Sequence, residues 1–331
     1  MVNRVALLGA ALAFALLAPA ERLRAAPVEI VAQPIHVFKT GQESARFGAL
    51  EFVGGLRLIS DAPLFGALSA IRFRPDAQSF VGVLDTGHWL TGTVVRDSAG
   101  RLSGVRDADI SEMLDVSGRP SPGKSEMDAE GLALVPGGVA VSYEQRHRID
   151  LYPDPGFATS KPVGRIDPLI PFDQLRHNRG LETLAISPTG SPLGGALVTV
   201  SEKSVDAHGN ILAAILDGPL KGRFTVKRSG DYDATDGAFL PNGDLLLLER
   251  RFSMASSIGM RIRRIPVEAI RPGSVADGEV LLDADFSHRI DNMEGLDVIS
   301  GPDGEPRIIV ASDDNHSLFQ NTLMLEFRIA P

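Results

Sequence analysis

The sequence predicts an all-β protein, a β-propeller of six blades in a single domain. Three observations point to this fold: hairpin-like segments recur along the chain, they recur at a period of about 50 residues, and turn-forming residues are abundant. The chain of 331 residues contains 34 glycines and 22 prolines, many of them in turns between short apolar runs. So many turn residues favour short strands over long helices.

Each repeat reads as a hairpin of two apolar strands. A polar, acidic segment leads into a first apolar run, a Pro/Gly turn follows, and a second apolar run ends on a carboxylate. The clear copies begin with DAEGL (128–132), NRGLE (178–182), DATDG (233–237) and NMEGL (292–296), and a weaker copy covers 66–88. Because a propeller blade needs about four strands, one such hairpin in about 50 residues is typical of one blade per repeat.

Further strands are expected between the hairpins. Apolar runs at 211–216, 261–267 and 321–329 are suited to this role. Residues 160–180 and 252–260 lack a strand pattern, so we expect loops over one face there.

The ends of the ring are expected to meet in one blade. Dividing residues 27–331 by a period of about 50 gives about six blades. The strand expected at 28–38 would pair with the last strand, which closes the ring and removes two exposed sheet edges. A β-sandwich or a β-helix also contains repeated hairpins. The period is too long for a β-helix, and the recurrence of the same polar pattern at each hairpin favours a ring.

Residues 1–26 resemble a secretory signal peptide. Arg4 precedes an apolar run at 5–17, and Ala18-Pro19-Ala20 offers a cleavage site of small residues. The run is short for a membrane span, although an N-terminal membrane anchor is the alternative. We therefore expect a periplasmic or secreted protein whose mature part, 27–331, is the single propeller domain.

Composition excludes several functions. The chain has no cysteine, which excludes disulfides, zinc-thiolate sites and cysteine nucleophiles. Its formal net charge is −9, and an acidic chain is a poor ligand for nucleic acid. We expect no nucleic-acid partner, no membrane partner after signal cleavage, and a monomer.

Two sets of carboxylates occupy repeat-equivalent positions and should meet at the centre of a propeller. The first set, at the entrance of the first strand, is Glu130, Glu182, Asp236 and Glu294. The second set, at the exit of the second strand, is Asp85, Glu144, Glu202, Glu249 and Asp313. Spacing to the following proline makes Thr235, next to Asp236, the strict counterpart of Glu130 and Glu182.

Carboxylates that converge on one axis repel one another unless a cation neutralises them. Hard oxygen ligands suit Ca²⁺, and other divalent cations are possible. The metal candidates are Glu130, Glu144, Glu182, Glu202, Asp236, Glu249, Glu294 and Asp313. The alternative is that each acid binds turn amides or an arginine.

Basic side chains follow the second-strand acids. Arg146 and Arg251 share a register after Glu144 and Glu249, and His147 follows Arg146. Arginine binds phosphate oxygens with two donors, and histidine can act as a general acid. The catalytic candidates are Glu130, Glu182, Glu294, Arg146, Arg251 and His147. Each arginine could instead neutralise a neighbouring glutamate.

The segments DAEGLA (128–133), GLETLA (180–185), DATDGAFLPNGDLLLLERRF (233–252), DNMEGLDV (291–298) and ASDDN (311–315) resemble the phytase-like family. That family, "esterase-like activity of phytase", consists of bacterial exported proteins, and the resemblance spans most of the chain after residue 60. It implies a propeller and a relation to phosphoesterase or esterase activity. No G-x-S-x-G serine-hydrolase motif accompanies it.

The sequence therefore predicts an exported metal-dependent hydrolase. It would act on a small anionic phosphoester or related ester at a carboxylate-rich central channel. Two alternatives stay open: a calcium-dependent lactonase, and a non-catalytic binding propeller stabilised by calcium. The net charge disfavours a polyanion such as phytate as the substrate.

Overall fold

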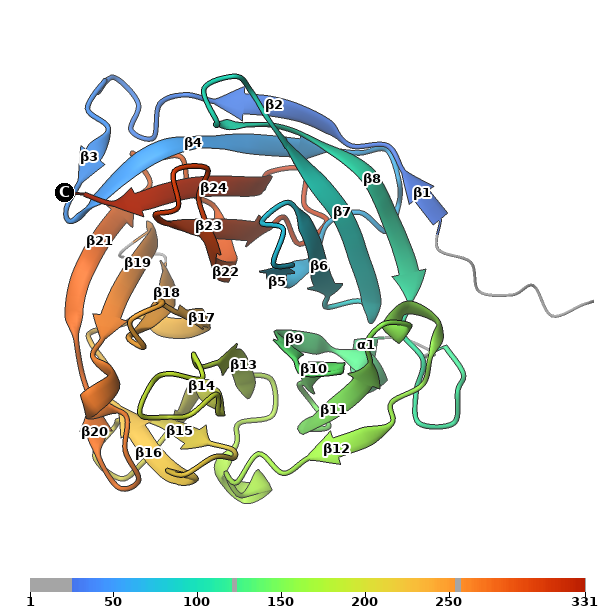
Figure 1. Ribbon diagram of the computed structural model, residues 1–331, viewed down its shortest axis with the longest axis vertical. Coiled ribbons are helices and arrows are strands. Elements are labelled where there is room, and N and C mark those ends of the chain that lie inside the picture. The colour runs from blue at the N-terminus through green and yellow to red at the C-terminus, as the bar shows by residue number, and fades with distance from the viewer. Residues whose placement is uncertain (1–25, 121–123, 254–256, 331) are drawn as a thin grey trace, which may run out of the picture.

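The computed structural model describes residues 26–120, 124–253 and 257–330 of the chain. Its strands form five sheets arranged as blades around one axis (Figure 1), and all strand pairs of the described residues are antiparallel except one at the outer edge of the third blade. The export signal predicted at 1–26 lies outside the described residues, except for Ala26 at the start of β1. Among the described residues, no helix has the length and apolar character needed to cross a membrane.

The first three blades follow one another along the chain. Blade 1 contains, from the axis outward, β5 (Leu68–Phe73), β6 (Ser79–Leu84), β7 (His88–Arg96), β8 (Leu102–Glu112) and β1 (Ala26–Val28). Blade 2 contains β9 (Ala129–Val135), β10 (Gly138–Tyr143), β11 (Arg148–Pro153) and β12 (Gly164–Ile166). Blade 3 contains β13 (Leu181–Ile186), β14 (Leu197–Val205), β15 (Ile211–Ile215), β16 (Gly222–Val226) and β20 (Val275–Ala276).

The last two blades complete the ring. Blade 4 contains β17 (Asp233–Phe239), β18 (Leu245–Ser253), β19 (Ser257–Ile265) and β21 (Glu279–Asp285). Blade 5 contains β22 (Asn292–Ser300), β23 (Pro306–Asp313), β24 (Thr322–Ile329), β4 (Leu50–Ile59) and β2 (Val31–Ile35), and β3 (Arg46–Phe47) pairs with β4. The short helices are α1 (Lys124–Met127), η1 (Phe157–Thr159), η2 (Phe172–Gln174) and η3 (Val267–Ala269).

The prediction of a propeller is confirmed, but the prediction of six blades is wrong. The length estimate assumed that each blade uses about 50 residues. The extra edge strands β1, β3 and β20 and long strands such as β8 use more of the chain, so it suffices for five blades.

Strands from both ends of the chain close the ring, as predicted. The strand paired with β24 is β4, in a register from Thr322 opposite Leu58 to Ile329 opposite Leu50. The segment expected in that place, 28–38, contributes β2 at the outer edge of the same blade. The runs at 211–216, 261–267 and 321–329 do form third strands, whereas much of 252–260 belongs to β18 and β19 instead of a loop.

The hydrophobic core is divided into five clusters, one between each pair of neighbouring blades. Strands in the inner half of a blade pack on both faces, so β5, the innermost strand of blade 1, and β10, the second strand of blade 2, are buried along their whole length. This explains why their sequences read as continuous apolar runs instead of alternating patterns.

An ion pair on the axis ties four of the blades together. Arg72 of β5 is buried and donates two hydrogen bonds of 2.7 Å to the carboxylate of Asp236 on β17. The same guanidinium also donates to the carbonyl oxygens of Leu184, Gly237 and Leu296, at 2.8, 3.1 and 2.7 Å. Asp236 accepts two further hydrogen bonds, from the amides of Gly237 and Leu296. Blades 1, 3, 4 and 5 therefore share one buried polar hub.

Replacing Arg72 with methionine should destabilise the whole propeller. The change leaves the Asp236 carboxylate buried without its counterion, which typically costs about 3–5 kcal/mol in the free energy of unfolding. Urea denaturation measures this loss. The control is Arg106→Met, because Arg106 forms an exposed pair with Asp107 and such pairs contribute about 0–1 kcal/mol. Equal losses in the two variants would contradict a structural role for the hub.

Candidate functional site: an acidic centre at one end of the ring

A β-bulge near the start of each innermost strand presents one side chain differently from the regular ladder. In β13, for example, Leu181 pairs with Ser201 and Thr183 pairs with Val200, so Glu182 is the extra residue. Bulges are known to redirect a side chain in this way. The corresponding residues in the five inner strands are Ser69, Glu130, Glu182, Thr235 and Glu294.

The second strand of each blade adds one residue at the same end of the ring. The residue before each bulge pairs with a residue on the second strand, and the next residue on that strand lies at the equivalent position. This next residue is acidic in blades 1, 2, 3 and 5, and it is Arg250 in blade 4. Ser201 pairs with Leu181 and precedes Glu202, whereas Glu249 pairs with Ala234 and precedes Arg250. The five equivalent residues are Asp85, Glu144, Glu202, Arg250 and Asp313.

These residues form what we call the acidic centre. It contains the carboxylates of Asp85, Asp128, Glu130, Glu144, Glu182, Glu202, Glu294 and Asp313. Three cationic side chains lie among them. Lys124 contacts Asp85, Arg179 donates to Glu202 at 3.0 Å, and Arg250 lies 2.6 Å from Glu294. Six of the eight metal candidates from the sequence are therefore brought together.

Two trios of carboxylates within the acidic centre have the spacing that a cation needs. Oxygens of Asp128, Glu130 and Glu144 lie within 4.8 Å of one another, and so do oxygens of Glu144, Glu182 and Glu202. Glu144 belongs to both trios, and one of its oxygens already accepts a hydrogen bond of 2.6 Å from the Gly180 amide.

One oxygen of the Asp128 carboxylate is free of hydrogen bonds from the described residues. Its Oδ2 accepts a hydrogen bond of 2.9 Å from Gln145. Its Oδ1 is buried and accepts no hydrogen bond from the described residues, with the Lys124 ammonium 3.6 Å away. The donor set of carboxylate oxygens is the type that Ca²⁺ prefers.

Burial and mutual repulsion raise the pKa values of these acids. Burial raises the pKa of Glu294 to about 8, with the Arg250 guanidinium opposing the shift. Burial likewise raises the pKa values of Glu144 and Asp313 to about 7. Burial, followed by neighbouring carboxylates, raises the pKa values of Glu130 and Glu182 well above the usual range. At neutral pH the centre must therefore hold protons or a cation.

The structure does not bring Asp236 or Glu249 to the acidic centre. Asp236 belongs to the hub with Arg72, where both of its oxygens are already hydrogen bonded. Glu249 is buried and its Oε1 lies 2.6 Å from Arg263. Each is displaced by one residue from the equivalent position, and one residue along a strand turns a side chain to the opposite face. Neither is retained as a metal ligand.

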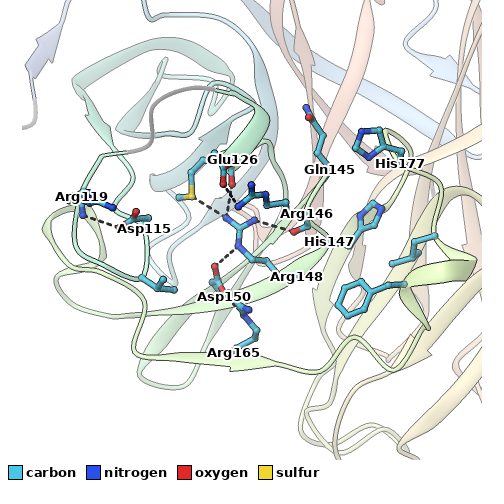
Figure 2. Close-up of a pocket in the computed structure, with 14 residues that line it drawn as sticks. Asp115, Arg119, Glu126, Gln145, Arg146, His147, Arg148, Asp150, Arg165 and His177 are labelled. Carbon is cyan, nitrogen blue, oxygen red and sulfur yellow. Dashed lines mark hydrogen bonds and ion pairs between the residues drawn. The ribbon is translucent and has the colours of Figure 1, made fainter.

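The predicted basic residues also lie outside the acidic centre. Arg146 lies 2.6 Å from Glu126 at the wall of a cavity beside blade 2 (Figure 2). His147 lines the same cavity, and burial lowers its pKa. Gly180 makes room for this ring, because a Cβ there would lie 2.4 Å from its Cε1. Arg251 lies over the ring of Tyr232, 5.1 Å from its centroid.

Arg250, Asp128 and Lys124 were missed in the sequence. Proline spacing gave no signal for Arg250, because Glu249 follows Pro241 by eight residues just as Glu144 follows Pro136. The turn between the two strands is longer in blade 4 than in blade 2, and this shifts the equivalent position to Arg250. Asp128 precedes Glu130 by two residues and lies directly before β9. Lys124 lies in α1, outside the repeat pattern, and no spacing indicated it.

No curated protein sequence matches the chain. The structure of U3-55K is similar at 10% identity with a TM-score of 0.39, over 79% of this chain and 95% of that chain. Regucalcin from Agrobacterium tumefaciens strain C58, described as a calcium-binding protein, is similar at 11% identity with a TM-score of 0.40, over 80% of this chain and 91% of that chain. Likeness at this level carries no argument about the chemistry of the site.

The family comparison is specific. A model of the family described as Phytase-like, esterase-like activity of phytase, matches residues 63–316. The matched range contains every residue of the acidic centre and the repeats on which the resemblance was noted. The chain belongs to the phytase-like family.

Proposed function

We propose that this protein is an exported hydrolase that uses a divalent cation, most simply Ca²⁺, to cleave a small ester at the acidic centre. One observation carries the proposal. Three bulge-positioned glutamates and the carboxylates that end the second strands converge at one end of the ring, at a density that requires neutralisation.

The residues that would hold the cation are those of the two trios, Asp128, Glu130, Glu144, Glu182 and Glu202. Their oxygens are hard ligands, which favour Ca²⁺ over softer metals. A bound divalent cation lowers the pKa of a bound water and polarises an ester oxygen. Carboxylates that do not ligate it, such as Glu294 with its pKa of about 8, can accept or return a proton near neutral pH.

Arg250 is the group suited to hold the ester. Its guanidinium contacts Glu294 and the side-chain oxygen of Asn292, and lies 3.5 Å from Glu202. A guanidinium in this place can bind an ester oxygen and stabilise the negative charge that develops there. The sequence assigned this role to Arg146 and Arg251, and we transfer it to Arg250.

The proposal extends to where this activity takes place. We propose that residues 1–26 direct export to the periplasm or outside the cell, where calcium is available to a site of moderate affinity. The proposed partner is a small-molecule ester or lactone, and the protein is proposed to act as a monomer without binding nucleic acid or membrane.

Glu182→Gln should weaken calcium binding by roughly tenfold or more, because it removes one charged ligand from the centre. Titration calorimetry with CaCl₂ after chelator treatment measures the dissociation constant. Glu279→Gln is the matched control, since Glu279 is exposed on β21 and, within the described part of the chain, forms just one long ion pair, 3.8 Å from Arg264. Calcium binding that is equal in both variants would contradict a metal site in the acidic centre.

The calcium-free protein should lose stability as pH rises from about 5 to about 8. Glu294 has a folded-state pKa of about 8 against an ordinary value of 4.5, so the folded state binds more protons in this window. The free energy of unfolding then falls with rising pH. Thermal unfolding in a chelator should show this slope, and calcium should raise the melting temperature more at high pH. Glu294→Gln should reduce the slope, and a melting temperature that rises with pH contradicts the pKa values.

Arg250→Met should reduce turnover by about 10²–10³-fold, the loss typical of removing one donor to a developing anion. The same change should leave calcium binding intact, because it removes a positive charge from the site. Release of p-nitrophenol from its phosphate and acetate esters, and opening of a simple lactone, identify the reaction class, with EDTA added as a test for the cation. Arg251→Met is the control, because Arg251 is the next residue in the chain but its side chain lies against Tyr232, outside the acidic centre.

Three results of these assays would contradict the proposed function. They are turnover that EDTA leaves unchanged, equal losses in Arg250→Met and Arg251→Met, and calcium binding without turnover of any of the three substrates. The last result would favour a non-catalytic propeller that calcium stabilises.

A further inference from the structure

We propose that the cavity flanking blades 3, 4 and 5 holds the non-reacting part of the substrate, and that this part is an apolar or aromatic group on an ester of low charge. The inference rests on the proposed function and adds the substrate class. It depends on the position of the cavity, on two exposed phenylalanines and on the pairing of the charges around them.

The cavity is continuous with the acidic centre. It has a volume of about 810 Å³, and Glu202, Arg250 and Asn292 form part of its wall. These residues contact the centre directly, since Asn292 donates a hydrogen bond of 2.9 Å to Glu294. An ester held at Arg250 would therefore extend its remaining atoms into this space.

Two aromatic side chains line the same cavity without a protein core to cover them. Phe252 is 80% exposed and Phe319 is 95% exposed. Phe252 follows Arg250 by two residues on β18, so strand alternation places both on one face of the sheet. Ile258, which pairs with Phe252 across the hairpin, and Ile290 extend the apolar lining. Exposed apolar groups gathered beside polar residues are typical of a binding site.

The loop that carries Phe319 is fixed to the acidic centre at one end. The Asn315 amide donates a hydrogen bond of 2.6 Å to Asp313, which belongs to the centre. At the other end, the backbone and side-chain amides of Asn321 donate to Asp291 at 2.9 and 3.0 Å. The exposed ring is therefore held on an anchored loop, as a preformed binding surface requires.

The charges of this cavity argue against a polyanion. Each of its three cationic side chains is paired with an acid: Arg179 with Glu202 at 3.0 Å, Lys203 with Asp233 at 2.5 Å, and Arg250 with Glu294 at 2.6 Å. A ligand with many phosphates would have to compete with these acids in a chain of net charge −9. A singly charged or neutral ester with an apolar group meets no such cost.

Binding of two stable phosphonates tests the inference without requiring turnover. Phenylphosphonate and methylphosphonate share the same anionic head and differ in the apolar group. By calorimetry with the full-length protein and calcium, phenylphosphonate should bind about tenfold more tightly, as expected for burying one aromatic ring. Phe252→Ala and Phe319→Ala should each reduce this preference, and together they should remove it.

Leu318→Ala is the matched control for the loop. Leu318 is 99% exposed, adjoins Phe319 and is not part of the cavity wall, so its loss should leave phenylphosphonate binding unchanged. Equal affinities for the two phosphonates, or the same loss in Leu318→Ala as in Phe319→Ala, would overturn the inference. Tighter binding of inositol hexakisphosphate than of phenylphosphonate would also overturn it, if Arg146→Ala, in the cavity beside blade 2, weakens that binding.

The two proposals fail separately in these assays. If phenylphosphonate binds through Phe252 and Phe319 but no ester is hydrolysed, the proposed binding cavity is correct and the proposed hydrolase activity is wrong. If esters are hydrolysed in a calcium-dependent way but the phenylalanine variants keep the full preference for the phenyl group, the proposed hydrolase activity is correct and the proposed binding cavity is wrong.

Discussion

The buried pair of Arg72 and Asp236 is the interaction on which the rest of this propeller depends. Five innermost strands converge at the axis, and their polar backbone groups there need partners away from water. One guanidinium meets carbonyl oxygens of three strands and a carboxylate of one of them. Because this hub holds the blades at a fixed distance from the axis, the bulges at one end of the same strands can aim their glutamates at a common point.

The acidic centre has the opposite character from the hub. At the hub, opposite charges are matched and the hydrogen bonds of Asp236 are satisfied. At the centre, eight carboxylates meet three cationic side chains, and burial and repulsion raise the pKa values of several acids toward or above neutrality. A fold that keeps so much unbalanced charge gains nothing in stability from it, and this is the reason for proposing that the centre binds a cation.

The residues of blade 4 show where prediction of the site from the sequence failed. Its repeat carries Thr235 at the bulge and Arg250 at the strand exit, where the other strong repeats carry acids. The acids next to these positions, Asp236 and Glu249, looked equivalent in the sequence, yet both are turned away and paired with arginines. A shift of one residue is small in an alignment and decisive on a strand, because successive side chains point to opposite faces.

The sequence by itself determined the β-propeller, the hairpin repeat, the closure of the ring by both ends of the chain, and the convergence of Glu130, Glu182 and Glu294. The hairpin follows from local periodicity and turn chemistry, and the ring, its closure and the convergence follow from the recurrence of that hairpin along the chain. Only the tertiary structure decided the number of blades, the hub of Arg72 and Asp236, and the place of Arg250. Blade number depends on how much chain the edge strands use, and contacts such as that of Arg72 with Asp236 join residues far apart in sequence, which no repeat encodes.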